Sequence, residues 1–147
     1  MSSPPAPAGE VRIARTADLA APLAVRMAVF VGEQGVSEAE EIDGKDECCL
    51  HWLAIDAVGP VATLRVQREG EVAKIGRVAV LPRARGQGIG LALMEAAMEA
   101  LRAEGVAGVT LGAQLSAMGF YERLGFAAHG PVYEDAGIPH RDMSRLL

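Results

Sequence analysis

The stretch from residue 74 to residue 90 reads KIGRVAVLPRARGQGIG, and the interpretation of the whole chain starts from it. Its first half is rich in β-branched residues, with Ile75, Val78 and Val80 as the apolar positions, which is typical of a strand inside a sheet. Pro82 ends this strand, because proline lacks the backbone N–H that a sheet ladder needs. The stretch therefore begins as a strand and changes character at Pro82.

Arginine and glycine fill the turn that follows, where residues 83–90 read RARGQGIG. A helix is predicted directly after this turn, with one apolar face formed by Leu93, Met94, Ala97, Met98 and Leu101. The free backbone N–H groups and the positive dipole end at the start of a helix favour a phosphate group. Arginine side chains add charge-assisted hydrogen bonds to the same anion. The turn therefore predicts a phosphate-binding loop.

Two common nucleotide loops fit this turn poorly. A P-loop needs a Lys-Ser or Lys-Thr pair after its last glycine, whereas Gly90 is followed by Leu91 and Ala92. The dinucleotide fingerprint needs the spacing GxGxxG, whereas this turn has GxGxG. Both alternatives are therefore weak.

Two segments, about thirty residues apart, resemble the motifs of the GNAT superfamily of N-acetyltransferases. The first is Arg83-x-x-Gly86-x-Gly88, which is similar to the acyl-CoA pyrophosphate motif of that superfamily, and the second is FYERLGF at residues 120–126. The resemblance implies an α/β fold with a mixed, mostly antiparallel sheet that splays at its centre and carries helices on both faces.

A narrower resemblance is to the ElaA-like subgroup of that superfamily. It rests on VFVGEQGV at residues 29–36, on Glu41-x-Asp43-x-x-Asp46 followed by His51, and on GIPH at residues 137–140. This resemblance leaves the acceptor substrate and the acyl chain length undefined.

Composition limits the classes of function. The chain has 147 residues, half of them hydrophobic, and a formal net charge of -5. A negative net charge argues against a general nucleic-acid-binding protein. No apolar run approaches the ~20 residues of a membrane span, so no membrane partner is expected. No Cys/His spacing resembles a metal site.

Residues 1–9 are rich in Pro, Ala and Ser and are predicted to be a disordered N-terminal tail, with residues 10–147 as a single domain. Cys48 and Cys49 are adjacent, and a bridge between neighbours is strained, so reduced thiols and a cytoplasmic location are expected. The sequence does not distinguish a monomer from a homodimer.

The predicted order of elements is β-α-β-β-β-α-β-α-β-β. The segments before the central strand are a strand at 10–15, a helix to about residue 31, a long acidic loop at 32–47 with room for a short helix, and a hairpin of strands at 50–58 and 61–68. After the helix that follows the central strand come a strand at 106–111, a short helix at 115–124, and last strands at 126–132 and 143–147. The GNAT fold has the same order.

The resemblance implies that acetyl-CoA is the co-substrate and that it lies where the central strand splays from the strand at 106–111. Its pantetheine arm is expected to pair with the central strand like an added strand. The implied acyl-CoA-binding residues are Val78, Ala79, Val80, Arg83, Arg85, Gly86, Gln87, Gly88, Ile89, Gly90, Gln114 and Tyr121.

Tyr121 matches the superfamily tyrosine near the CoA sulfur, and the resemblance implies that its hydroxyl protonates the departing thiolate. The alternative is a core aromatic residue that packs beside Phe120 and Phe126. Many superfamily members carry a glutamate on the central strand that acts as general base. This chain has Arg77 in the comparable stretch, and arginine stays protonated and cannot accept a proton.

The general base must then come from elsewhere, unless the amine arrives neutral. The acidic loop offers Glu33 and Glu41 as the candidate catalytic carboxylates, with Asp43 and Asp46 beside them, and His51 and His140 are further candidates. The loop is also expected to attract a cationic amine, although a charged run is as often a solvated surface. The superfamily transfers its acyl group directly, so a covalent cysteine intermediate is not expected.

These observations predict an acyl-CoA-dependent N-acyltransferase that moves acetyl to a primary amine of a small molecule or peptide by direct attack in a ternary complex. The alternatives are a non-catalytic acyl-CoA-binding sensor on the same fold and a nucleotide-dependent enzyme of another class.

Overall fold

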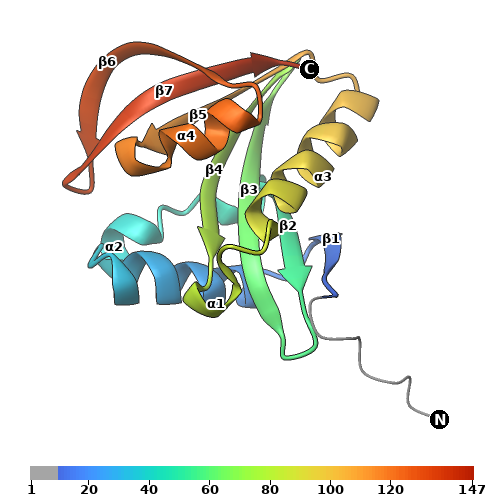
Figure 1. The fold of residues 1–147 in the computed structure, drawn as a ribbon, viewed down its shortest axis with the longest axis vertical. Helices are drawn as coiled ribbons and strands as arrows, with labels where there is room; N and C mark the ends of the chain where they lie inside the picture. Colours follow the sequence, from blue (N-terminus) through green and yellow to red (C-terminus); the bar gives the residue numbers. More distant parts are fainter. Residues whose placement is uncertain (1–9) are drawn as a thin grey trace.

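The computed structural model describes residues 10–147, so the predicted tail at residues 1–9 lies outside the described residues. Figure 1 shows the elements in space. They are β1 (Arg12–Thr16), α1 (Ala20–Arg26) continued by a π-helical segment (Met27–Glu33), α2 (Glu38–Glu41), β2 (Leu50–Ile55), β3 (Pro60–Glu69), β4 (Val72–Val80), α3 (Ile89–Ala103), β5 (Gly108–Gln114), α4 (Met118–Arg123), β6 (Ala127–Asp135) and β7 (Ile138–Leu146). Short 3₁₀ turns lie at Asp46–Cys48, Pro82–Ala84 and Leu115–Ala117.

All seven strands form one sheet in the order β1-β2-β3-β4-β5-β7-β6, and the predicted mixed α/β fold is confirmed. Every neighbouring pair is antiparallel except β4 and β5. Those two strands pair only at Val72–Lys74 with Gly108–Thr110 and then separate. The sheet is therefore splayed at its centre, as the sequence predicted.

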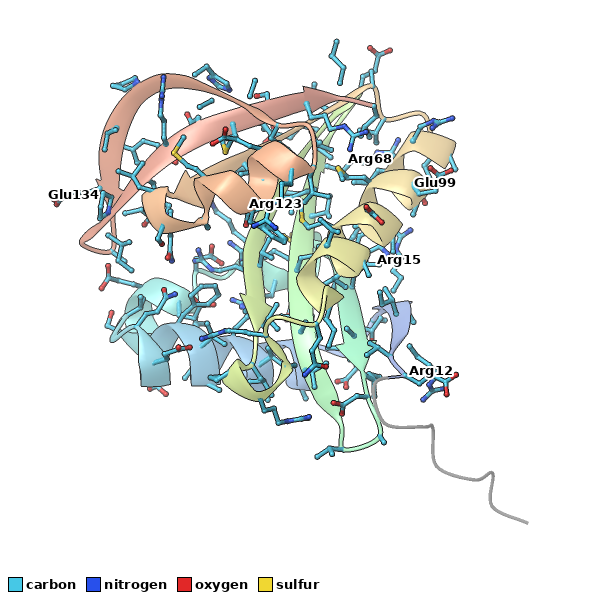
Figure 2. The ribbon with its side chains drawn as sticks, in the orientation of Figure 1. Arg12, Arg15, Arg68, Glu99, Arg123 and Glu134 are labelled. Carbon is cyan, nitrogen blue, oxygen red and sulfur yellow. The ribbon has the colours of Figure 1, made fainter. Side chains whose placement is uncertain are left out.

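Helices cover the two faces of the sheet, as Figure 1 shows. Helix α3 packs on β2, β3 and β4 through the predicted apolar face, because Leu93, Met94 and Leu101 are fully buried there. Helix α1 contacts the same three strands from the opposite side, where Val25 and Val29 form a smaller apolar cluster. The labelled charged side chains in Figure 2 lie on the outside of the molecule.

A β-bulge bends β4 in its middle, because Thr63 pairs with Ala79 but Arg65 pairs with Gly76. Arg77 takes up the extra residue with φ +52°, a left-handed conformation that costs a non-glycine residue about 1–2 kcal/mol. The extra residue changes which side chains face α3, so Ile75 before the bulge and Val78 after it pack against the same core. The bulge lies where β4 leaves β5.

Several segments differ from their predicted bounds: β2 ends at Ile55 and not at residue 58, and β5 is Gly108–Gln114 and not 106–111. The first helix runs two residues further, since its π-helical continuation ends at Glu33. The short helix for which the acidic loop had room is α2, whose first residue follows the N-cap Ser37. The last two strands form a longer hairpin than predicted, with Ala136 and Gly137 in its turn. Within residues 10–147, no helix is long and apolar enough to span a bilayer.

Candidate active site

A cleft of about 970 Å³ opens where β4 and β5 separate, and we call it the central cleft. Its volume is in the range of small-molecule and cofactor sites. One wall is the π-helical segment with the loop after it, and the opposite wall is the start of α3 together with α4. Most of the predicted site residues line it: Glu33, Glu41, Val78, Ala79, Val80, Arg85, Gly86, Gly88, Ile89, Gly90, Gln114 and Tyr121.

The turn at residues 83–90, which we call the glycine loop, presents free backbone donors to this cleft. Within the described chain, none of the backbone N–H groups from Gly86 to Gly90 donates a hydrogen bond to another residue. Gly88 caps α3 in a left-handed conformation with φ +76°, which a residue with a side chain adopts only with strain. A Cβ at Gly90 would lie 3.4 Å from both Phe120 and Val80, so glycine allows these walls to close on the helix start. The loop has the donors and the close approach that a pyrophosphate needs.

The arginines of the loop already have partners on the protein. Arg85 donates from Nη1 to Glu33 at 2.6 Å and from Nε to the backbone oxygen of Val80 at 3.0 Å. The hydrogen bond from Arg85 lowers the pKa of the Glu33 carboxyl below its usual range. Arg83 donates to Asp56 at 2.7 Å.

Two predicted CoA residues, Arg83 and Gln87, do not line the central cleft. The Gln87 amide nitrogen instead lies 3.3 Å from the backbone oxygen of Arg83. A role of these two side chains in binding acyl-CoA stays a prediction.

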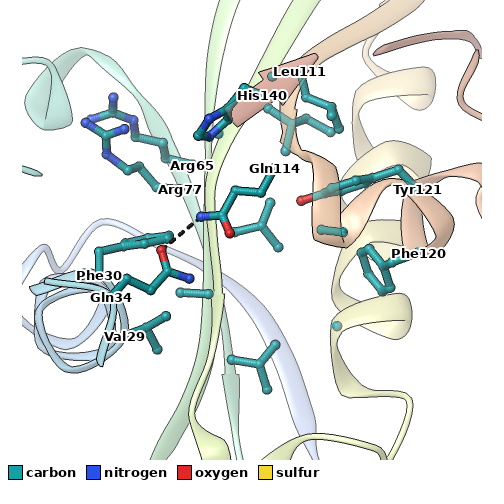
Figure 3. Close-up of a pocket in the computed structure, with 18 of the residues that line it drawn as sticks. Val29, Phe30, Gln34, Arg65, Arg77, Leu111, Gln114, Phe120, Tyr121 and His140 are labelled. Atoms are coloured by element: carbon teal, nitrogen blue, oxygen red, sulfur yellow. Dashed lines mark hydrogen bonds between the residues drawn. The ribbon is translucent and has the colours of Figure 1, made fainter. Parts of the chain in front are cut away.

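Tyr121 lies on α4 with its ring packed edge-on between Phe120 and Phe126, at centroid distances of 5.0 and 6.0 Å. Burial raises the pKa of its phenol well above the usual value, so the hydroxyl stays protonated at neutral pH. No hydrogen bond from this hydroxyl to any of residues 10–147 is present. Figure 3 shows that the hydroxyl points toward Gln114, across the cleft. The ring is therefore part of the core, and its hydroxyl is a free proton donor at the cleft.

A side-chain bridge joins the residue after the π-helical segment to the end of β5. The amide nitrogen of Gln114, at the end of β5, donates to the amide oxygen of Gln34 at 2.9 Å, and Figure 3 draws this bond. Gln34 is not among the predicted site residues, although it belongs to the segment VFVGEQGV on which the ElaA-like resemblance rests. The bridge lies in the cleft that holds the hydroxyl of Tyr121.

Three carboxylates of the acidic loop, Glu41, Asp43 and Asp46, are not a free negative surface, because they join a closed ring of ion pairs with three arginines. We call it the ion-pair ring. In order around the ring, the contacts are Arg26–Glu41 at 2.7 Å, Glu41–Arg77 at 3.3 Å, Arg77–Asp43 at 3.4 Å, Asp43–Arg65 at 2.5 Å, Arg65–Asp46 at 3.0 Å and Asp46–Arg26 at 2.7 Å. Three positive charges therefore match three negative ones.

Burial makes this ring structural. Arg26 and Glu41 are 1% and 2% exposed, and buried charges of this kind are stable only when they are paired. Hydrogen bonds from Arg65 lower the pKa of Asp43 below its usual range. Arg77 is held less tightly than the other arginines, since its Nε lies near Glu41 without the alignment of a hydrogen bond.

The two carboxylates predicted as bases are both bound to arginine, Glu33 to Arg85 and Glu41 to Arg26. For Glu33 this hydrogen bond lowers the pKa and so weakens the carboxylate as a base, because its charged form is stabilised. A catalytic role for either residue stays a prediction, and neither is free in this structure.

The other candidates lie in different environments. His51 is 2% exposed and bonds the backbone oxygen of Asp46, so it lies outside the central cleft. His140 lines the cleft. Cys48 and Cys49 also lie outside the cleft, and burial raises the pKa of the Cys49 thiol, which disfavours a reactive thiolate.

Comparison with known proteins gives consistent matches. The family described as Acetyltransferase (GNAT) domain matches residues 20–147. The uncharacterized protein YyaT of Bacillus subtilis is 36% identical over 139 residues, covering 92% of this chain and 94% of YyaT.

Two solved structures are similar over almost the whole chain. The crystal structure of Escherichia coli ElaA is 32% identical with a TM-score of 0.82, covering 92% of this chain and 99% of that one. An acyl-CoA N-acyltransferase from Pseudomonas aeruginosa is 34% identical with a TM-score of 0.80 and the same coverage.

Proposed function

The chain belongs to the GNAT acetyltransferase family, and on that premise we propose that it transfers acetyl from acetyl-CoA to a primary amine by direct attack in a ternary complex. The acceptor is a small molecule or a peptide, and the reaction takes place in the cytoplasm. The observation that carries this proposal is the shared cleft: the free N–H groups of the glycine loop and the free hydroxyl of Tyr121 open into one space.

Acyl-CoA fits this cleft by its chemistry. The glycine loop offers N–H groups to the pyrophosphate, and Arg85 turns its guanidinium to the phosphates after leaving Glu33. The pantetheine amides take the place that β5 leaves open beside β4, near Val78 and Val80. A backbone N–H of β4 polarises the thioester carbonyl.

Tyr121 is the proposed general acid. Attack by the amine expels a thiolate, and a protonated phenol with no other partner is suited to neutralise it. The hydrophobic walls formed by Phe30 and Phe120 exclude water from the thioester.

One observation favours a second candidate, a non-catalytic acyl-CoA-binding sensor. Arg77 lies on the strand where many family members carry a glutamate as general base. Both Glu33 and Glu41 are bound to arginine. A sensor needs the glycine loop but no base.

Two measurements test the proposal. In calorimetry and thermal-shift assays, acetyl-CoA is expected to bind and raise the melting temperature, whereas ATP and NAD are not. A panel of amino acids, polyamines and short peptides is then screened for release of free CoA, and mass spectrometry identifies the acetylated product. Binding of acetyl-CoA without acetylation of any amine would favour the sensor, and a Tm response to ATP or NAD alone would favour a nucleotide enzyme.

A further inference from the structure

We propose that His140 is the general base of this site and takes a proton from the ammonium group of the acceptor. The inference rests on the proposed function, because it names the residue that prepares the amine for the same transfer. It is carried by the position of the side chain, by the hydrogen bond that fixes its tautomer, and by the pairing of the competing bases.

The sheet places His140 at the mouth of the splay. It lies on β7 opposite Gln114, the last residue of β5, and opposite Tyr133 on β6. Its imidazole stacks on the Tyr133 ring at 5.9 Å with an interplanar angle of 22°, which holds the ring in one orientation. In Figure 3 the imidazole lies beside Gln114, on the side of the cleft where Arg65 and Arg77 lie.

A backbone hydrogen bond fixes which nitrogen is the base. The Nδ1 atom lies 2.7 Å from the backbone oxygen of Ile138. A carbonyl oxygen only accepts hydrogen bonds, so Nδ1 carries the proton, and in the neutral ring Nε2 carries the lone pair. Within residues 10–147, Nε2 has no hydrogen-bond partner. The nitrogen that can accept a proton is therefore unoccupied.

The other histidines lack this property. The Nε2 atom of His51 is engaged with the backbone oxygen of Asp46 inside the protein. The Nε2 atom of His129 lies 2.6 Å from the hydroxyl of Ser144, and His129 does not line the central cleft. Among the candidate bases, the carboxylates of Glu33 and Glu41 are bound to arginine as described above. His140 alone among the candidates named above combines access to the cleft with a free lone pair.

Charges of both signs face this imidazole. On its own half of the sheet are Asp135 and the phenol of Tyr133, whose hydroxyl donates to Asp142 at 2.8 Å. Burial, followed by this hydrogen bond to Asp142, raises the pKa of Tyr133 to about 12, so the phenol stays neutral. The guanidinium groups of Arg65 and Arg77 lie on the same side of the cleft as the imidazole.

The proton balance of the step is complete. The acceptor R–NH₃⁺ gives one proton to Nε2 of His140, and the neutral amine attacks the thioester carbon. The C–N bond forms, the C–S bond breaks, and Tyr121 gives its proton to the leaving sulfur. The nitrogen of the attacking amine also loses a proton as the intermediate collapses. The phenolate of Tyr121 takes up this proton and becomes neutral again. The imidazolium then releases its proton to solvent.

The test compares His140→Gln with the matched control His129→Gln, using acetyl-CoA with two small acceptors. Ethylamine is charged at neutral pH and needs a base, whereas hydroxylamine is uncharged. We expect His140→Gln to lower kcat/KM for ethylamine about tenfold or more, because general base catalysis contributes roughly 10²–10⁴-fold. The loss with hydroxylamine should stay within a few-fold, acetyl-CoA affinity should not change, and His129→Gln should behave as wild type.

The pH profile gives a second kinetic criterion. A base that takes a proton from the ammonium group lets the enzyme use the charged amine, so wild-type kcat/KM for ethylamine should depend less steeply on pH than that of a variant without the base. Without the base only the neutral fraction of ethylamine reacts, so kcat/KM of His140→Gln should keep rising steeply as pH increases. Equal losses of His140→Gln with both acceptors, or no loss with either, would overturn the assignment.

A measurement without turnover separates this inference from the proposed function. Long-range ¹H–¹⁵N spectra of the free protein report the tautomer of each histidine, and His140 is expected to be protonated at Nδ1 when neutral. An Nε2-protonated His140 would overturn the base assignment even if the enzyme acetylates amines. Conversely, a wild-type protein that releases no CoA with any amine would refute the proposed function, whatever tautomer His140 shows.

Discussion

Replacing Glu41 by glutamine separates its structural role from a catalytic one. Glutamine keeps the shape of the side chain and removes its charge. Arg26, which is 1% exposed and donates to Glu41 from Nε at 2.7 Å, then loses one of its two carboxylate partners inside the protein. Asp46 remains as the other partner of Arg26. The substitution therefore opens the ion-pair ring at its most buried contact.

The expected cost follows from that geometry. Removing one partner of a buried ion pair costs about 3–5 kcal/mol, and the value here should lie near the lower end because Asp46 still neutralises Arg26. A chain of this size loses about 2–4 °C in Tm for each kcal/mol. We therefore expect Tm to fall by about 6–12 °C, with acetyl-CoA affinity retained at temperatures where the variant is folded.

Urea unfolding and thermal melts measure the change, with Glu40→Gln as the control. Glu40 is the exposed neighbour, and its carboxylate accepts a hydrogen bond only from Ser37, so this variant should stay within about 0.5 kcal/mol of wild type. A Glu41→Gln protein that melts like wild type but has lost kcat would refute the structural argument and identify Glu41 as a catalytic residue.

Three further predictions concern the cleft and the ring. Gly88→Asp places a negative charge at the glycine loop and should weaken CoA binding about tenfold or more, as measured by calorimetry. The control Gly70→Asp lies at a similarly left-handed turn outside the cleft and should leave CoA affinity unchanged. Tyr121→Phe should lower kcat about tenfold or more with little change in Tm, and a loss of stability with kcat kept would mean that the hydroxyl is structural. Asp43, whose pKa the hydrogen bond from Arg65 lowers, stabilises the fold above the unfolded pKa of about 3.9 and loses this effect as pH falls through its lower folded value. The stability difference between wild type and Asp43→Asn, measured by urea unfolding, should therefore shrink below about pH 4, and a difference independent of pH would contradict this account.

Most of the fold could be predicted because local patterns and the two motifs agreed. The apolar face of α3 and the turn at Gly59 and Pro60 are written into short segments. The bulge also has a sequence signal: Ile75 and Val78 are three residues apart, whereas an uninterrupted strand would place residues of one face two apart. The strand was predicted from its apolar composition, and the bulge was not predicted.

The site was less predictable because its chemistry depends on partners that are distant in sequence. The acidic loop predicted a negative surface, since Arg26 and Arg65 belong to α1 and β3 and nothing local connects them to it. Likewise, the stacking of Tyr133 on His140 follows from strand register, which the sequence of either strand does not specify. The sequence therefore predicted which kinds of side chain the site contains, but not which of those side chains contact one another.

The ion-pair ring also constrains how this protein can change over evolutionary time. Each carboxylate in the ring contacts two arginines and each arginine contacts two carboxylates, so a single change of charge leaves two neighbours unmatched. Substitutions at Asp43 and Arg65, for example, should survive mainly as compensated pairs. Among relatives, the six positions should therefore covary as one unit.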